Sequence, residues 1–137
     1  MTPIDSGPGE MQMLFWAIVL GLVQLTLAGL AGVWERGLPW AIGPRDAPAK
    51  PLGLYAARLE RAWRNFLETF PFFAAAVLVA HALGRHGEWS VPGAQLYVAA
   101  RLLYVPAYVA GIPFVRTLIW LVALLGIVLV ARAVWPG

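Results

Sequence analysis

The stretch from Met11 to Trp34 contains no charged residue, and it constrains the fold more than any other segment of the chain. A helix of this length is long enough to cross the roughly 30 Å of hydrocarbon in a bilayer. The whole chain of 137 residues agrees, being 61% hydrophobic and only 12% charged, where soluble domains carry about 25% charged residues. Seven tryptophans and four tyrosines suit a protein that is anchored at two water–lipid interfaces. The sequence therefore predicts an all-α integral membrane protein.

Three further apolar segments follow the first, and turn residues separate them. The connection over 35–53 is rich in proline and glycine and predicts a loop, 84–93 is a polar turn, and 111–113 is a tight hairpin. We expect a single membrane domain over 1–137, folded as a four-transmembrane-helix bundle. Its helices are expected at about 11–34, 54–83, 94–110 and 114–135.

Composition also excludes several classes of function. The chain has no cysteine, so disulfides, thiolate metal sites and a cysteine nucleophile are all excluded. His81 and His86 have no further ligands near them in the sequence, so we expect no metal site. The formal charge of +3 is too small, and the chain too apolar, for a nucleic-acid-binding protein.

The basic residues are distributed unequally between the two ends of the expected bundle. The positive-inside rule places the richer end in the cytoplasm. Both the 1–2 and the 3–4 connections are then cytoplasmic, and both termini are outside. The richer end holds Arg36, Arg45, Lys50, Arg58, Arg61, Arg64 and Arg116, whereas only Arg85 and Arg132 fall at the other.

Polar side chains continue into two of the expected spans, each along one face. At about 100° per residue, the polar stripe of the second helix falls within an arc of about 80°. That of the third helix falls within about 60°. Lipid cannot solvate such side chains, so they must face each other, a neighbouring subunit or a water-filled cavity. The first stripe holds Arg58, Arg61, Asn65, Glu68 and Phe72, with Arg64 at its edge, and the second holds Tyr97, Arg101, Tyr104 and Tyr108.

Two interpretations of the stripes are open from the residues alone. One buried pair, such as Arg101 with Glu68, could pin the two helices together, as interhelical polar contacts do in membranes. However, the stripes carry more cations than Glu68 can neutralise, and excess buried charge is costly unless an anion shares it. The planar fork of arginine also suits bidentate binding of carboxylates. The balance slightly favours an anionic ligand.

The motif "RLERAWRNFLETFP" over 58–71 resembles the helix-two signature of the MAPEG family, the membrane-associated proteins in eicosanoid and glutathione metabolism. Its spacing is R-x-x-R-A-x-x-N-x-x-E-x-x-P. The segment "ARLLYVPAYVAGIPFVRTLIW" over 100–120 is similar to the family's third helix and its turn into the fourth. The resemblance covers nearly the whole chain.

The resemblance implies a homotrimer that binds glutathione between neighbouring subunits, in a site open towards the cytoplasm. Arg116 matches the arginine that stabilises the glutathione thiolate in the family, and Thr117 stands where the prostaglandin synthase branch has a serine. Tyr104 departs from that branch, which has a histidine there. The glutathione-contacting positions that match are Arg61, Arg64, Asn65, Glu68, Arg101, Tyr104 and Tyr108, to which the stripe adds Arg58.

The expected activity is that of a glutathione transferase or peroxidase acting on lipophilic electrophiles. Arg61, Arg64 and Arg101 would bind the two carboxylates of glutathione, and Arg116 would lower the pKa of its thiol. The lipophilic substrate would enter from the surrounding lipids. The alternative is a non-catalytic membrane scaffold or accessory subunit that keeps the family fold, and membership of a larger membrane complex stays open in either case.

Overall fold

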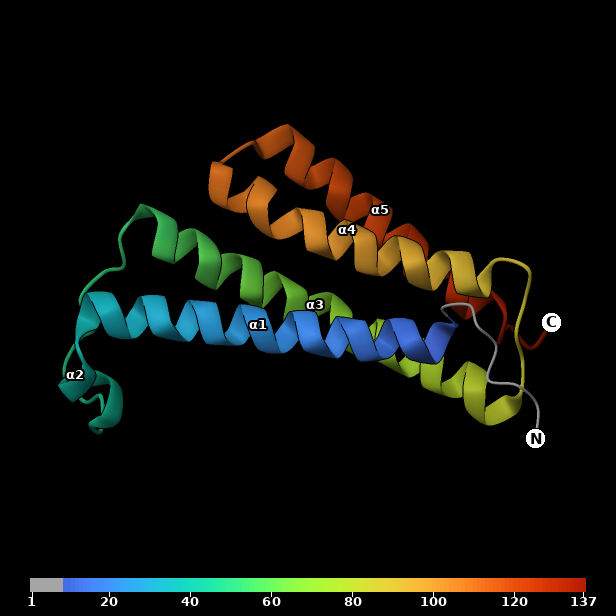
Figure 1. The fold of residues 1–137 in the computed structure, drawn as a ribbon, viewed down its shortest axis with the longest axis horizontal. Helices are drawn as coiled ribbons and strands as arrows, with labels where there is room; N and C mark the ends of the chain where they lie inside the picture. The colour runs from blue at the N-terminus through green and yellow to red at the C-terminus, as the bar shows by residue number, and fades with distance from the viewer. Residues whose placement is uncertain (1–8) are drawn as a thin grey trace.

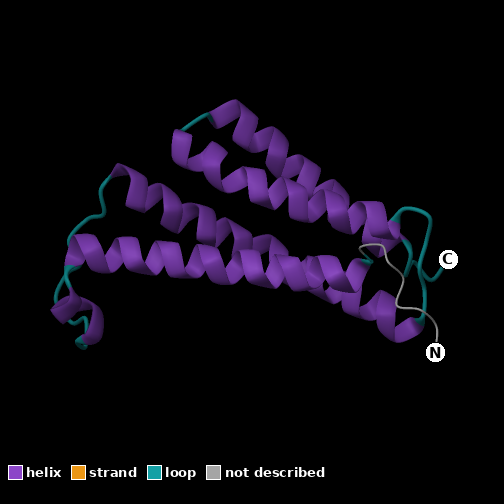
Figure 2. Ribbon diagram, in the orientation of Figure 1, coloured by secondary structure: helices purple, strands orange, loops and turns teal. Residues whose placement is uncertain are grey.

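The computed structural model describes residues 9–137, and all regular secondary structure in that range is helical. Four long helices run side by side, and one short helix lies in the first connection (Figures 1 and 2). The helices are α1 (Glu10–Arg36), α2 (Leu38–Ile42), α3 (Leu54–Leu83), α4 (Ser90–Ala110) and α5 (Pro113–Arg132).

The helix bounds differ from the expected ones mainly in the connections. The range 35–53 is not entirely a loop, because α1 continues to Arg36 and α2 follows directly. Pro39 is tolerated there because it stands in the first turn of α2, where a backbone N–H has no helical partner. For the same reason α4 begins at Ser90 rather than near residue 94, with Pro92 in its first turn. The range of α3 is the same as expected, and α5 ends three residues before the expected 135.

The connection between α4 and α5 is a tight hairpin built by glycine and proline. Gly111 has φ of 76°, a left-handed conformation that residues with a Cβ rarely adopt. Its N–H donates to the carbonyl of Tyr108 at 3.0 Å, and the N–H of Ile112 donates to Ala107 at 3.3 Å. These bonds satisfy the free carbonyls at the end of α4. Pro113 then starts α5, so Tyr108 and the first turn of α5 lie near each other.

The two connections α1–α3 and α4–α5 lie at one end of the bundle, and the α3–α4 connection lies at the other with the C-terminus (Figure 1). We call the first end the connection end. This arrangement brings the polar stripe of α3 and that of α4 to the same half of the molecule. Which side of a membrane the connection end faces stays a prediction.

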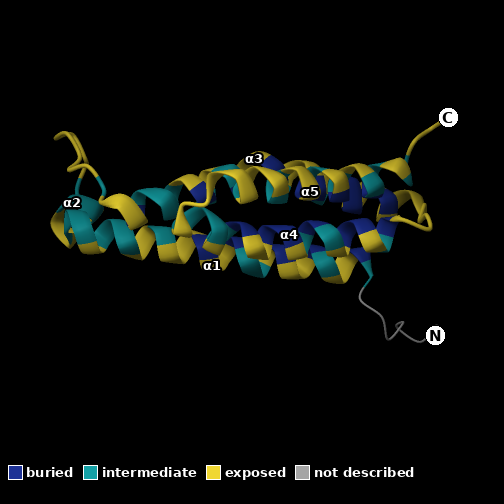
Figure 3. Cartoon of the chain, turned by 90° about the horizontal axis from the view of Figure 1, so that it is seen from above, coloured by how far each residue is buried: buried dark blue, intermediate teal, exposed yellow. Residues whose placement is uncertain are grey.

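The buried core is concentrated away from the connection end. The ring of Phe73 stacks on that of Tyr97 with centroids 4.1 Å apart, and small residues such as Ala17, Ala94 and Ala123 pack around them. In contrast, no residue of α1 after Gln24, and none of α5 before Ala123, is buried. Figure 3 shows buried residues where the helices face each other and exposed ones on the outer ridges. One chain therefore leaves the connection end of α1 and α5 uncovered.

Backbones of α4 and α5 approach closely because glycines meet at their crossing. A Cβ at Gly126 would lie 2.6 Å from the carbonyl oxygen of Gly93 and 2.8 Å from the amide nitrogen of Tyr97. Small residues allow this kind of close packing between membrane helices. The crossing fixes the position of α5, and with it the position of Arg116.

Three of the helices, α1, α3 and α5, are long and apolar enough to cross a membrane by length and composition. Their outer faces carry large exposed apolar side chains, among them Phe15, Leu22 and Leu121, as a lipid-facing surface requires. The helix lengths and the apolar outer surface are therefore those of a membrane protein. That α4 is a fourth span, and that the bundle assembles as a homotrimer, stay predictions.

Candidate functional site

The guanidinium of Arg101 is the most deeply buried charge of the described residues. Arg101 belongs to α4 and is fully buried where α4 faces α3. Its Nη1 donates to Asn65 Oδ1 of α3 at 2.7 Å. Its Cζ lies 4.1 Å from the ring centroid of Tyr104 and 5.7 Å from that of Phe66. Nε and Nη2 are buried and have no hydrogen-bond partner within residues 9–137. Two of its donor groups therefore remain unsatisfied in the isolated chain.

The suggested pin between Arg101 and Glu68 is wrong. Glu68 is exposed, and Arg101 is paired instead with Asn65, one turn earlier on α3. Three residues advance a helix by about 300°, so the Glu68 side chain points about 60° away from that of Asn65. The amide oxygen of Asn65 occupies the place where the carboxylate was expected. Arg101 is thus held by a neutral acceptor, and it forms no ion pair within residues 9–137.

Arg61 and Arg116 converge on one tyrosine from two different helices. Arg61 Nε donates to the hydroxyl of Tyr108 at 3.1 Å, and its Cζ lies 5.8 Å from the ring centroid. The Cζ of Arg116, at the start of α5, lies 4.9 Å from the same centroid. The ring of Tyr108 contacts that of Tyr104 edge to face at 5.6 Å. We call these five residues, Arg61, Arg101, Tyr104, Tyr108 and Arg116, the arginine–tyrosine cluster.

Arg58 caps the end of α4, and its expected contact with glutathione stays a prediction. Its Nη1 donates to the carbonyl of Val109 at 3.0 Å, in the last turn of α4, where carbonyls lack helical partners. A Cβ at Gly111 would lie 2.7 Å from Nη1, so this glycine leaves room for the guanidinium. Arg58 therefore fixes the end of α4 and the hairpin to α5. It still lines a pocket of about 170 Å³ together with Tyr108 and Arg116.

Arg64 lies apart from the cluster. Its Nη2 forms an ion pair with Glu60 Oε1 at 2.8 Å, four residues earlier on α3, and its side chain is 70% exposed. Among residues 9–137, no other arginine forms an ion pair. The cluster consequently holds three arginines with no paired carboxylate, and the cost of an unpaired buried charge falls on Arg101, since Arg61 is exposed and Arg116 is partly buried.

A second small pocket joins the cluster to the residues that follow Arg116. It has a volume of about 190 Å³ and lies between Asn65, Tyr104, Arg116, Thr117 and Trp120. The hydroxyl of Thr117 donates to the carbonyl of Pro113 at 3.2 Å within α5, so its proton is already engaged. Trp120 was not expected from the sequence, although its place four residues after Arg116 puts both on one helix face.

Tyr97, the remaining member of the α4 stripe, belongs to the core. Its hydroxyl shares a hydrogen bond of 2.9 Å with that of Thr69, and both side chains are buried. Thr69 is a polar partner that the sequence analysis missed. Phe66, which lies beneath Arg101, was missed as well because an aromatic residue in an apolar span gives no distinct signal. In residues 9–137 no group of three or more histidine or acidic side chains is placed to hold a metal ion.

Comparison with known proteins gives one match. The model of the MAPEG family matches residues 13–135 of the chain, a range that includes all of the arginine–tyrosine cluster. No curated protein and no solved structure matches the chain.

Proposed function

The chain belongs to the MAPEG family, and from this premise we propose that it is a membrane-embedded, glutathione-dependent transferase or peroxidase acting on lipophilic electrophiles. The observation that carries the proposal is that no arginine of the arginine–tyrosine cluster forms an ion pair within residues 9–137. Glutathione brings two carboxylates and, once ionised, a thiolate. Three arginines without paired carboxylates are a matching set of partners for these three anionic groups.

The carboxylates of glutathione are assigned to Arg61 and Arg101. Arg101 Nε and Nη2 lack partners within residues 9–137, and because both are buried a carboxylate reaches them only if the neighbouring side chains move. Asn65 accepts from the third nitrogen, Nη1. Glu68 is exposed beside Asn65 on α3 and is available to the α-amino group of the tripeptide. Arg64 can join only by leaving Glu60, and an exposed ion pair of this kind is worth at most about 1 kcal/mol.

Arg116 is the candidate for activating the thiol. An unperturbed thiol has a pKa of about 8.5 and is mostly protonated at neutral pH. Lowering that pKa by about two units requires roughly 2.7 kcal/mol of preferential stabilisation of the thiolate, which a nearby guanidinium can supply. Arg116 lines the pocket with Tyr104 and Thr117 and pairs with no carboxylate of the described residues. Thr117 can take part only if its hydroxyl leaves the carbonyl of Pro113.

We propose a homotrimer because the single chain leaves part of its helix surface uncovered. The connection end of α1 and the first half of α5 hold no buried residue, and the cluster lies at this same end. A neighbouring copy would cover these faces and close the site. The excess of basic residues supports a cytoplasmic opening, with the lipophilic substrate arriving from the lipid phase.

The proposal is tested on the full chain purified in mild detergent. We expect glutathione to raise the unfolding temperature in a concentration-dependent manner and a lipophilic electrophile to be conjugated. Arg61→Ala and Arg101→Ala should lose most of the thermal shift, whereas the control Arg85→Ala, at the opposite end, should keep it. An unfolding temperature that does not change in millimolar glutathione, together with no conjugation, would favour the alternative of a non-catalytic scaffold.

A further inference from the structure

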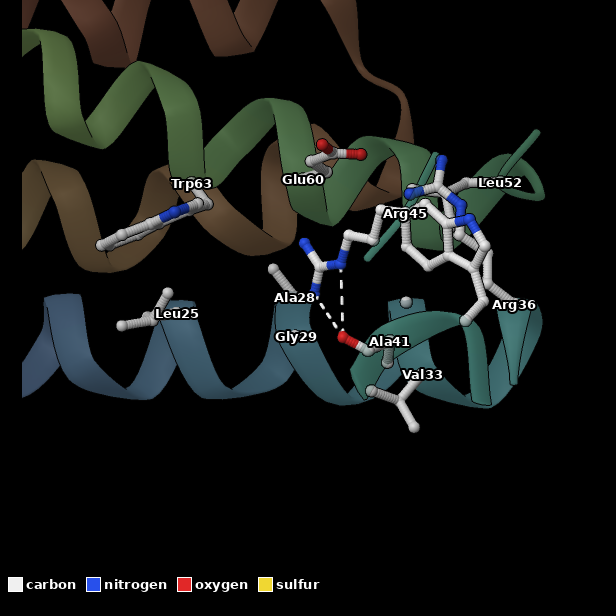
Figure 4. A pocket seen from close by; sticks show the side chains of 12 residues that line it. Leu25, Ala28, Gly29, Val33, Arg36, Ala41, Arg45, Leu52, Glu60 and Trp63 are labelled. Carbon is white, nitrogen blue, oxygen red and sulfur yellow. Dashed lines mark hydrogen bonds between the residues drawn. The ribbon is translucent and has the colours of Figure 1, made fainter. Parts of the chain in front are cut away.

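A further pocket lies at the connection end between α1, α2 and α3, lined by none of the cluster residues. It has a volume of about 240 Å³. Figure 4 shows its two ends: Leu25 of α1 lies at one, and Arg36 lies at the other. A Cβ added at Gly29 or at Gly32 would meet no other atom within 4 Å, so the middle of the pocket along α1 is open. The pocket is thus polar at the end of the bundle and apolar towards its middle.

Two guanidiniums at the polar end are held over one indole ring. The Cζ of Arg36 lies 5.0 Å from the ring centroid of Trp40, and that of Arg45 lies 4.9 Å from it. Arg36 Nε donates to the carbonyl of Lys50 at 2.8 Å, and Arg45 donates to the carbonyl of Ala41 from Nε and Nη2 at 3.3 and 2.9 Å. Backbone oxygens therefore position both cations, and neither forms an ion pair in the part of the chain that the structure describes.

The backbone of Arg45 is also unusual. Its φ is 60°, and it is the only residue other than glycine between positions 9 and 137 with a positive φ. Such a conformation is unfavourable for a residue with a Cβ and is uncommon outside glycine. The guanidinium of this residue is the one that lies 4.9 Å from the ring centroid of Trp40. The one acidic residue that lines the pocket, Glu60, is paired with Arg64 at 2.8 Å and is not paired with either cation.

We propose that this pocket binds an anionic phospholipid, with the phosphate at Arg36 and Arg45 and an acyl chain along α1 past Gly32 towards Leu25. Basic pockets beside membrane helices bind anionic head groups in this way, and tryptophan is the usual residue at the level of the head groups. The lipid would tie α2 to the ends of α1 and α3, where the chain alone is poorly packed. This inference does not depend on the proposed glutathione chemistry.

The test compares phosphatidylglycerol with phosphatidylcholine of the same acyl chains, by native mass spectrometry of lipid adducts on the full chain. We expect the wild type to retain phosphatidylglycerol at least about tenfold better. The double variant Arg36→Gln, Arg45→Gln should lose that preference. The matched control Arg85→Gln, Arg132→Gln removes two cations at the other end and should keep it. Equal retention of the two lipids by the wild type, or equal loss in the control, would overturn the proposal.

A second variant keeps both charges and blocks the pocket instead. Gly32→Leu introduces a side chain into open space, so the fold should form, and retention of phosphatidylglycerol should fall about tenfold. Undiminished retention would contradict the assigned path of the acyl chain. Two competitors test the identity of the ligand. Glutathione should not displace the lipid, and oleate should bind less well than phosphatidylglycerol; either result reversed would overturn the assignment to a separate phospholipid site.

Discussion

The contact between Arg101 and Asn65 tests whether the polar stripes are kept for stability or for a ligand. The double change Arg101→Met, Asn65→Leu removes both partners of the 2.7 Å hydrogen bond, a replacement that is close to neutral when both are exchanged for apolar groups of similar shape. The lost bond to a charged group is worth about 1.5–3 kcal/mol. In the wild type, two donors of Arg101 are buried without partners within residues 9–137, and each lowers stability by about 1–3 kcal/mol. The double variant removes this cost.

The remaining terms also oppose each other. The double variant loses the cation–π contact with Tyr104 at 4.1 Å, worth about 2 kcal/mol when desolvated. It is relieved of the cost of burying a guanidinium, which is several kcal/mol and already includes the cost of the two unpartnered donors. We therefore expect the free energy of unfolding to change by less than about 2 kcal/mol in either direction, while the stabilisation by glutathione disappears. In the wild type that stabilisation reaches about 2.7 kcal/mol at a hundred times Kd.

The assay is thermal unfolding in mild detergent, with and without glutathione. The matched control is Thr69→Val, Tyr97→Phe, which removes both partners of the neighbouring α3–α4 hydrogen bond and should keep the glutathione shift. The reasoning is refuted if the Arg101 variant unfolds far below the wild type and still responds fully to glutathione. Arg101 would then be a structural contact between the helices.

Three further outcomes are expected. Gly126→Ala should destabilise the fold by about 1–3 kcal/mol in thermal unfolding, because its Cβ would lie 2.6 Å from the carbonyl oxygen of Gly93; wild-type stability would contradict the crossing. Arg58→Met should lower the free energy of unfolding by about 1.5–3 kcal/mol, because the carbonyl of Val109 loses its donor. The control Arg64→Met breaks an exposed ion pair and should cost under about 1 kcal/mol. Equal effects of the two changes would contradict the capping role of Arg58. Native mass spectrometry in mild detergent should show trimers, and monomers and dimers alone would contradict the proposed assembly.

The sequence predicted the long helices well where an apolar stretch ends at a glycine. Gly53 and Gly84 flank α3, and its bounds are those expected from the pattern. The start of α4 was placed late because Pro92 and Gly93 indicate a turn, although a proline in the first turn costs no hydrogen bond. The short helix α2 was missed because five residues around a proline give no helical period.

The pairing of the polar side chains was predictable only in part. Helical spacing placed Asn65 and Arg101 on facing stripes, but not which side chain of α3 Arg101 would contact. The ion pair of Arg64 with Glu60 was predictable, because residues four apart on a helix lie on the same face. The bond from Arg58 to the carbonyl of Val109 could not be foreseen, because a backbone acceptor is the same at every residue.

The most direct test of the account is the ionisation of bound glutathione, followed by its ultraviolet thiolate absorbance over pH, in the wild type and in Arg116→Leu. The matched control is Arg132→Leu, at the other end of α5. We predict a thiol pKa about two units below the free value of about 8.5 in the wild type and the control, and a return towards that value in Arg116→Leu. Turnover should fall about a hundredfold in Arg116→Leu, corresponding to about 2.7 kcal/mol, with glutathione affinity nearly intact. The same titration curve and the same turnover in Arg116→Leu and the wild type would contradict thiolate activation by Arg116.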